Sequence, residues 1–329
     1  MSTLAPTLQA FFTDRLARQR QASPHTISAY RDALKLLLAF AAEHTGKAPS
    51  DLAITDLDAP VIGAFLDHLE TERGNGIRTR NARLAAVHAL FRFAALQHPE
   101  HAEVIQRVLA IPPKRFARTI ITYLTEPETA ALLAAPDKAT RTGRRDHALL
   151  VLAVQTGLRV SELTALTRAD IRLGTGAHVN CLGKGRKQRI TPLTPTVIRV
   201  LSEWLTERGG EPVDPLFPSR YGDAMSRDAL ERRLTKYAGI AAQAEPTLAE
   251  KKVSPHVLRH TAAMRLLAAG VDTTVIALWL GHESTATTQV YIHADLALKE
   301  QALARTAPLD TLPGRYRPSD DVMAFLASL

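Results

Sequence analysis

The chain has 329 residues, enough for two domains with separate cores, and its formal net charge is +8. The basic excess divides evenly on either side of Arg118, which favours an anionic partner for both halves. Cys181 is the single cysteine, which excludes a disulfide framework and a thiolate metal cluster. The first residues lack a signal-peptide pattern, and no apolar segment approaches the ~20 residues of a membrane span. We therefore expect a soluble, cytoplasmic protein.

The first hundred residues carry four helical patterns separated by turn signals. Apolar residues recur at helical spacing over 7–21 and 24–44, then from Pro60 onwards, and again over 77–97. Four such helices predict a compact all-α domain over residues 1–110.

Basic residues gather at the start of the fourth helix and in the segment that follows the domain. The Pro-Pro pair within 111–121 breaks helical order and marks this segment as a linker. These side chains are either a solvated face or contacts to DNA phosphates. The candidates for DNA contact are Arg78, Arg80, Arg83, Lys114 and Arg115.

The second domain, predicted over 122–307, opens with a helix-capping signal and an almost wholly apolar helix over 145–156. Arg159 follows the end of this helix, where it either pairs with Glu162 or presents its head group to a ligand. Alternation over 170–193 predicts a small antiparallel sheet whose hairpin tip carries Lys184.

Two further helices, a loop and a tail complete the pattern. Helices are expected over 196–208 and 226–238, and the second bears Arg232, a further candidate for DNA contact. Residues 241–252 are expected to form an inserted surface loop. The tail over 308–329 combines a proline-rich strap with a short amphipathic helix that must dock, on its own domain or on another subunit.

Residues 254–291 are expected to form three short helices, and four of their polar residues are not explained by the apolar faces: His256, Arg259, His282 and Tyr291. Arginine matches a phosphate, imidazoles exchange protons, and a phenol can attack phosphorus. A tyrosine side chain has a pKa of ~10, so forming its phenolate at neutral pH costs about 4 kcal/mol of free energy. A tyrosine nucleophile therefore needs cations or a proton acceptor beside it.

These motifs resemble the tyrosine recombinases, the family of phage integrases and XerC/XerD-like enzymes. Several motifs occur in the family's order. They are T-G-L-R-V-S-E-L at 156–163, G-K-G-R-K-Q-R at 183–189, H-V-L-R-H at 256–260, L-G-H at 280–282 and T-T-Q-V-Y-I-H at 287–293, with a weaker match at 23–34. The resemblance implies a mainly α fold with a small antiparallel sheet, in which a four-helix core-binding domain precedes an α+β catalytic domain.

The resemblance also implies a role for each matching residue. Tyr291 would attack a DNA phosphodiester to form a 3′-phosphotyrosine, while Arg159 and Arg259 hold the phosphate. His256 would handle the proton of the nucleophile, His282 would hydrogen-bond the phosphate, and Lys184, preferred here to Lys187, would protonate the leaving oxygen. The basic residues Arg186 and Lys187 of the same hairpin are candidates for DNA contact.

The resemblance further implies a site-specific recombinase that needs neither metal nor ATP. Its partners would be double-stranded DNA sites and a homo- or hetero-tetramer in which the C-terminal helix docks on a neighbouring subunit. The alternatives are a type IB topoisomerase-like enzyme and a non-catalytic DNA-binding protein. A zinc site at His256 and His260 is disfavoured, since Val257 stands where H-E-x-x-H needs its glutamate and no third ligand is well spaced.

Overall fold

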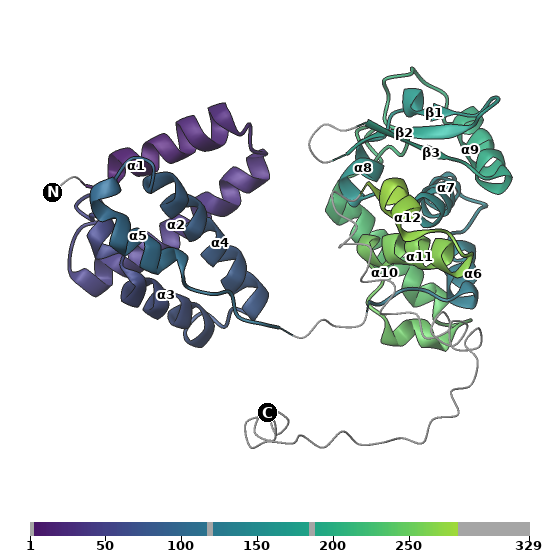
Figure 1. The fold of residues 1–329 in the computed structure, drawn as a ribbon. Helices are drawn as coiled ribbons and strands as arrows, with labels where there is room; N and C mark the ends of the chain where they lie inside the picture. Colours follow the sequence, from purple (N-terminus) through teal and green to yellow (C-terminus); the bar gives the residue numbers. More distant parts are fainter. Residues whose placement is uncertain (1–2, 117–120, 184–187, 282–329) are drawn as a thin grey trace, which may run out of the picture. The chain divides into compact units, whose positions relative to one another are not determined.

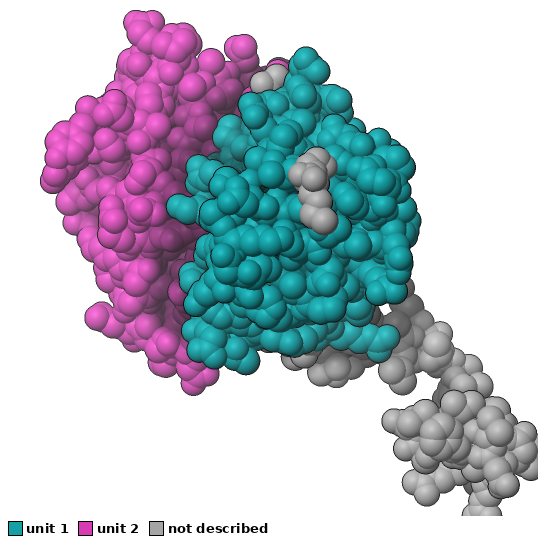
Figure 2. Space-filling model, turned by 90° about the vertical axis from the view of Figure 1, so that its left-hand side faces the viewer, with its two compact units in different colours: residues 1–119 teal, residues 120–329 magenta. Residues whose placement is uncertain are grey.

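The computed structural model describes residues 3–116, 121–183 and 188–281. The chain divides into two compact units, residues 1–119 and 120–329. Figure 1 colours the chain along its sequence, and Figure 2 shows the two units in different colours. Each unit has a hydrophobic core of its own. The division falls within the segment 111–121 that the sequence predicts as a linker.

The described part of unit 1 consists of helices and their connections, with an isolated antiparallel bridge between Thr3 and Ala53. Its longer elements are α1 (Ala5–Ala10), which continues as a π-helix (Phe11–Gln19), α2 (Pro24–Thr45), α3 (Ala59–Thr71), α4 (Ile77–Ala94) and α5 (Ala102–Leu109), with short 3₁₀ turns at Ile54–Asp56 and Pro99–His101. The termini of α2 follow from local chemistry. The Ser23 hydroxyl accepts a hydrogen bond from the Thr26 amide, Pro24 opens the helix, and Gly46 ends it at a positive φ of 70°.

The core of unit 1 gathers large side chains from helices that are distant in the sequence. Phe11, Phe65 and Phe91 are almost completely buried, and the Phe11 ring stacks on Tyr30 with 6.3 Å between centroids. Helix α5 is an element that the sequence analysis missed. It contributes two buried residues, Ile105 and Val108, and packs on α4 and α3. Its four apolar residues, Val104, Ile105, Val108 and Leu109, have helical spacing, but eight residues are too few for a helix that is stable without tertiary packing.

The segment after α5 is attached to α4 rather than leaving unit 1 directly. The Asn81 side chain donates to the Lys114 carbonyl (2.8 Å) and accepts from the Lys114 amide (3.0 Å). Arg78 lies over the Phe116 ring, 5.0 Å from its centroid. The first half of the predicted linker is therefore part of unit 1.

Unit 2 places a buried helix between other helices and a small sheet at one end (Figure 1). Helix α7 packs against α6, α9 and α11. The elements are α6 (Glu126–Ala134), α7 (Arg141–Thr156), α8 (Val160–Ala165), β1 (Ile171–Arg172), β2 (His178–Leu182), β3 (Gln188–Pro192), α9 (Pro195–Arg208), α10 (Arg227–Ala241), α11 (Pro255–Ala268) and α12 (Thr273–Leu280), with 3₁₀ turns at Arg168–Asp170 and Pro246–Glu250. The predicted fold class, mainly α with a small antiparallel sheet, is confirmed.

The sheet has the order β1-β2-β3 with antiparallel neighbours. Val179 lies opposite both Ile171 and Thr191, and these three side chains are buried. Cys181, also buried, lies opposite Arg189. The alternation along β2 and β3 therefore turns one face of the sheet toward the core, as period-2 patterning requires.

Residues 241–252, expected as a surface loop, are integrated into unit 2. Leu248, in the 3₁₀ turn, is 2% exposed and belongs to the core. Lys251 donates to the buried Glu128 carboxylate (2.7 Å) and to the Tyr123 carbonyl (3.0 Å). The sequence suggested a loop because one leucine among polar residues gives no periodic pattern.

No helix within 3–116, 121–183 and 188–281 is both long and apolar enough to cross a membrane.

The burial of Leu248 gives a first prediction. Leu248→Ala should lower the free energy of unfolding of unit 2 by about 2–5 kcal/mol, because it removes a core side chain and leaves a cavity. Chemical denaturation followed by circular dichroism measures the loss. The matched control is Glu250→Ala, an exposed position two residues away, which should change stability by less than about 0.5 kcal/mol. Equal, small effects of the two changes would mean that the segment is a dispensable loop.

Candidate functional site

The end of α7, the central helix of unit 2, fixes the position of Arg159. Gly157 closes α7 in the left-handed conformation (φ 63°), and Leu158 is buried, which fixes the backbone on both sides of the turn. Arg159 then begins α8, where its amide donates to Glu162 (2.8 Å) in a capping box. The Arg159 head group also donates to the same carboxylate through Nη1 (2.8 Å).

Arg259 approaches the same region from α11. Ser254 caps that helix by accepting from the Val257 amide, and Arg259 lies on the next turn with 5% of its surface exposed. Its Nη1 donates to the Gly157 carbonyl (2.7 Å) and its Nη2 to the Leu280 carbonyl (2.7 Å). Arg259 therefore connects the end of α7 to the end of α12.

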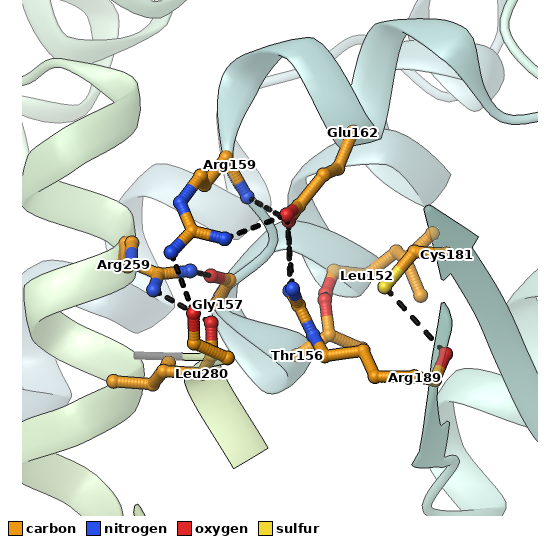
Figure 3. Close-up of polar contacts among 10 residues, drawn as sticks. Leu152, Thr156, Gly157, Arg159, Glu162, Cys181, Arg189, Arg259 and Leu280 are labelled. Carbon is orange, nitrogen blue, oxygen red and sulfur yellow. Dashed lines mark hydrogen bonds and ion pairs between the residues drawn. The ribbon is translucent and has the colours of Figure 1, made fainter. Parts of the chain in front are cut away.

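The two arginines meet at the carboxyl end of α12. Arg159 Nη2 donates to the Gly281 carbonyl (2.7 Å), next to the Leu280 carbonyl that accepts from Arg259 (Figure 3). The last carbonyls of a helix lack partners within the helix, so they are natural acceptors for guanidinium groups. Motifs that are a hundred residues apart in the sequence are thus brought to adjacent backbone positions.

Gly157 makes this meeting possible by its size as well as its conformation. A Cβ at this position would lie 2.6 Å from Leu280 Cδ2 and 3.0 Å from Ala262 Cβ. The end of α7 therefore packs directly on α11 and α12, and both guanidinium groups lie beside that contact.

Glu162 holds two arginines at once. Its carboxylate, 5% exposed, accepts from Arg159 and also from Arg189, which donates through Nη1 (2.9 Å) and Nη2 (2.7 Å). Burial by itself would raise the pKa of the Glu162 carboxyl, but hydrogen bonds from Arg189 and from the Arg159 backbone outweigh it and hold the pKa below its usual value. The carboxylate is therefore charged at neutral pH.

Arg189 is the member of this cluster that the sequence analysis missed. It belongs to the basic run at 183–189, where we selected Lys184, Arg186 and Lys187 as candidates. The signal that distinguishes Arg189 is its place two residues into β3, where alternation sets its side chain apart from those of its neighbours Gln188 and Ile190.

The histidines of α11 differ in exposure. His256 is exposed on the first turn, whereas His260 is partly buried and its ring centre is 6.5 Å from that of His256. Burial, together with the nearby His256 and Arg259, lowers the pKa of His260 to about 4, so its ring is neutral at pH 7. Among the residues that the structure describes, no group of three or more His, Cys, Asp or Glu side chains could hold a metal ion.

Five predicted site residues lie outside the described residues. They are Lys184, Arg186, Lys187, His282 and Tyr291. Lys184 follows the end of β2 by two positions, and His282 comes directly after the Gly281 carbonyl that binds Arg159. Their proposed roles remain predictions.

The predicted DNA-binding residues of unit 1 divide by exposure. Arg78 and Arg115 are exposed, but Arg80 is 6% exposed, donates to Asn81 (3.2 Å) and has its Nε 3.9 Å from Glu70. Lys114 is exposed and also binds Glu70. Burial of Arg80 indicates a structural role on α4 and does not support the DNA contact that we predicted for it.

Two other candidates complete the set. Arg83 is partly buried on α4, one turn after Arg80, and Arg232 is exposed on α10. Exposure makes a phosphate contact accessible to Arg232, while burial of Arg83 Nη1 limits the part of that head group available to a ligand.

Comparison with known proteins identifies the family to which these features belong. Residues 122–297 match the phage integrase family, and residues 10–98 match the phage integrase N-terminal SAM-like domain. The chain is 54% identical over 330 residues to a Sinorhizobium fredii protein with the provisional name integrase/recombinase y4rC, covering 100% of this chain and 99% of that protein. It is 34% identical to the tyrosine recombinase XerC of Pelobacter propionicus, covering 90% and 93% of the two chains.

Solved structures share the fold. The XerH site-specific recombinase in a post-cleavage complex with its palindromic difH substrate matches with a TM-score of 0.69 at 24% identity, over 87% of this chain and 81% of that one. The Tn1549 transposon integrase bound to circular intermediate DNA matches with a TM-score of 0.68 at 16% identity, over 93% and 100%.

The contrast between Arg78 and Arg80 gives a second prediction. If Arg78 contacts a phosphate as predicted, Arg78→Gln should weaken DNA binding uniformly across sequences and reduce the slope of log K against log salt by about 1. Arg80→Gln should instead lower the free energy of unfolding by about 1–3 kcal/mol. Salt-dependent binding assays and thermal denaturation of both variants measure the two effects. The assignment is wrong if Arg80→Gln changes the salt slope without changing stability.

Proposed function

This chain belongs to the phage integrase family and is a tyrosine recombinase, and from that premise we propose that it cuts and rejoins DNA at specific sites through a covalent 3′-phosphotyrosine. The observation that carries the proposal is the meeting of Arg159 and Arg259 on the Gly281 and Leu280 carbonyls. Two guanidinium groups side by side are suited to the two non-bridging oxygens of one phosphodiester.

The arginines would act mainly on charge that develops during the reaction. Attack on phosphorus concentrates negative charge on the equatorial oxygens, and preorganised donors in a partly buried site stabilise that charge without reorganising. Arg259 is buried and Arg159 is held by the Glu162 carboxylate, so both head groups are oriented before DNA arrives. No metal or nucleotide cofactor is part of the proposal.

The covalent step is proposed for Tyr291, whose phenol oxygen attacks phosphorus while the bond to the 5′ oxygen of the next nucleotide breaks. The phenol proton passes to His256, and Lys184 gives a proton to the departing 5′ oxygen. His282 donates to the phosphate. The phosphotyrosine bond retains the energy of the phosphodiester, so a 5′ hydroxyl from a second strand can reverse the step and complete strand exchange.

The proposed partners are two duplex DNA sites and three further recombinase subunits, identical or related. Unit 2 carries an apolar groove of about 710 Å³ among α7, α9, α11 and α12, and its lining includes Val151, Met264 and Trp279. We propose that the amphipathic tail over 319–329 of a neighbouring subunit docks there, in keeping with the apolar stripe of that tail.

Trapping of the covalent intermediate tests the proposed chemistry. Duplexes from the flanks of the protein's own locus, nicked so that the cleaved end diffuses away, should accumulate a protein–DNA adduct that resists denaturation. Tyr291→Phe should abolish the adduct and retain DNA binding, because it removes only the attacking oxygen. Electrophoresis under denaturing conditions measures the adduct, and binding without an adduct in the wild-type protein would contradict the proposal.

Adduct trapping, supercoil relaxation and strand exchange between two sites together separate the alternatives. A type IB topoisomerase-like enzyme would relax supercoiled DNA as a monomer and leave two sites unjoined, whereas a recombinase exchanges strands between two sites. A non-catalytic DNA-binding protein would bind without forming an adduct.

The docking groove gives a further prediction. Deleting residues 319–329 should leave binding to a single site unchanged within about threefold and lower the yield of two-site complexes about tenfold or more, because the contact between subunits is lost. Light scattering of protein–DNA complexes measures the change. The control is Leu96→Ser, which changes an apolar side chain of unit 1 that is 76% exposed. A truncated protein that still pairs two sites would rule out this docking.

A further inference from the structure

Arg189 donates to Glu162, the carboxylate that also accepts from Arg159. Both of its terminal nitrogens donate to Glu162, one to each carboxylate oxygen, and 11% of its side chain is exposed. Glu162 Oε1 also accepts from Arg159 Nη1, and Oε2 from the Arg159 amide. Figure 3 shows the resulting row of Arg189, Glu162 and Arg159.

We propose that Arg189 is a positioning residue that acts through Glu162 to hold the Arg159 guanidinium toward the scissile phosphate. The proposal rests on the proposed function, and it extends that function to a residue outside the set of six that the motifs supply. Arg189 itself would not touch DNA at the reacting phosphorus.

The reason lies in how one carboxylate is shared. Arg189 binds Glu162 as a bidentate pair, with one hydrogen bond to each carboxylate oxygen. The Arg159 side chain makes a single hydrogen bond to the same carboxylate. Without Arg189, the buried negative charge would draw Arg159 into a tighter pair. The guanidinium would then turn away from the phosphate that it must bind.

Arg189 also packs against the residue that receives Arg159. A Cβ on Gly281 would lie 2.7 Å from Arg189 Nη1 and 3.3 Å from its Cδ. Gly281, whose φ is 66°, accepts from Arg159 through its carbonyl. The Arg189 side chain therefore supports Arg159 from two directions, through Glu162 and through the end of α12.

The position of Arg189 in β3 connects this support to the sheet. β3 begins four residues after Lys184 in the sequence, and Arg189 pairs with Cys181 of β2 across the ladder. β3 is thus joined through Glu162 to Arg159, the arginine for which phosphate binding is proposed.

Single-turnover cleavage of the nicked duplex at saturating protein tests this role. Arg189→Met should lower the rate of adduct formation about tenfold or more, since a displacement of the order of 1 Å is enough for such a loss. The dissociation constant for DNA should change by less than about threefold. Arg189→Lys keeps the charge without the planar fork, so it should recover folding and part of the rate.

A matched control separates positioning from stability. Arg208 is similarly buried, at 8% side-chain exposure, and pairs with Asp214 (3.6 Å) at the far end of α9. Arg208→Met should lower thermal stability by a comparable amount and leave the cleavage rate unchanged. The same cleavage loss in both variants would overturn the proposal.

A double-mutant cycle with Arg159→Lys supplies the decisive readout. If Arg189 acts through Arg159, Arg189→Met should lower the rate of adduct formation by a much smaller factor in the Arg159→Lys background than in the wild-type protein. Full additivity, or a wild-type rate for Arg189→Met, would overturn the positioning role alone. Absence of a Tyr291-dependent adduct in the wild-type protein would overturn the proposed function as well.

Discussion

The structure of unit 2 depends on two adjacent backbone carbonyls at the end of α12. Leu280 accepts from Arg259 and Gly281 accepts from Arg159, and Arg259 also donates to the Gly157 carbonyl, so these bonds join α7, α8, α11 and α12. Each bond pairs a helix-terminal acceptor with a charged donor, which is stronger than a neutral hydrogen bond. The local fold and the orientation of both arginines thus have a common cause, so a change that disturbs one will disturb the other.

Close packing around glycines makes this arrangement possible. Gly157 lets Leu280 and Ala262 approach the end of α7, and Gly281 lets the Arg189 guanidinium approach the end of α12. Both glycines also adopt positive φ, which a side chain would disfavour. The glycines of T-G-L-R and L-G-H are therefore as much a part of the site's construction as the polar residues beside them.

The sequence predicted what periodicity and motifs encode and missed what tertiary contact decides. The helices around Leu37, Val151 and Trp204, and the antiparallel sheet, follow from apolar spacing. Arg80 looked like its exposed neighbour Arg78, because nothing local shows that α3 brings Glu70 beside it. Leu248 looked like a loop residue, because its partners come from distant segments.

Charge alone was likewise an insufficient guide within the site. The run at 183–189 offers four basic side chains, and sequence cannot rank them unless the strand register is known. The pairing of Gln188 with Leu182 begins β3, so the next residue, Arg189, lies opposite Cys181. The Arg189 side chain reaches Glu162. A buried carboxylate between two arginines requires both for a full set of charge-assisted bonds. Glu162 is therefore better understood as a shared support of Arg159 and Arg189 than as the simple ion-pair partner of Arg159, and the cluster around it includes β3 as well as α8.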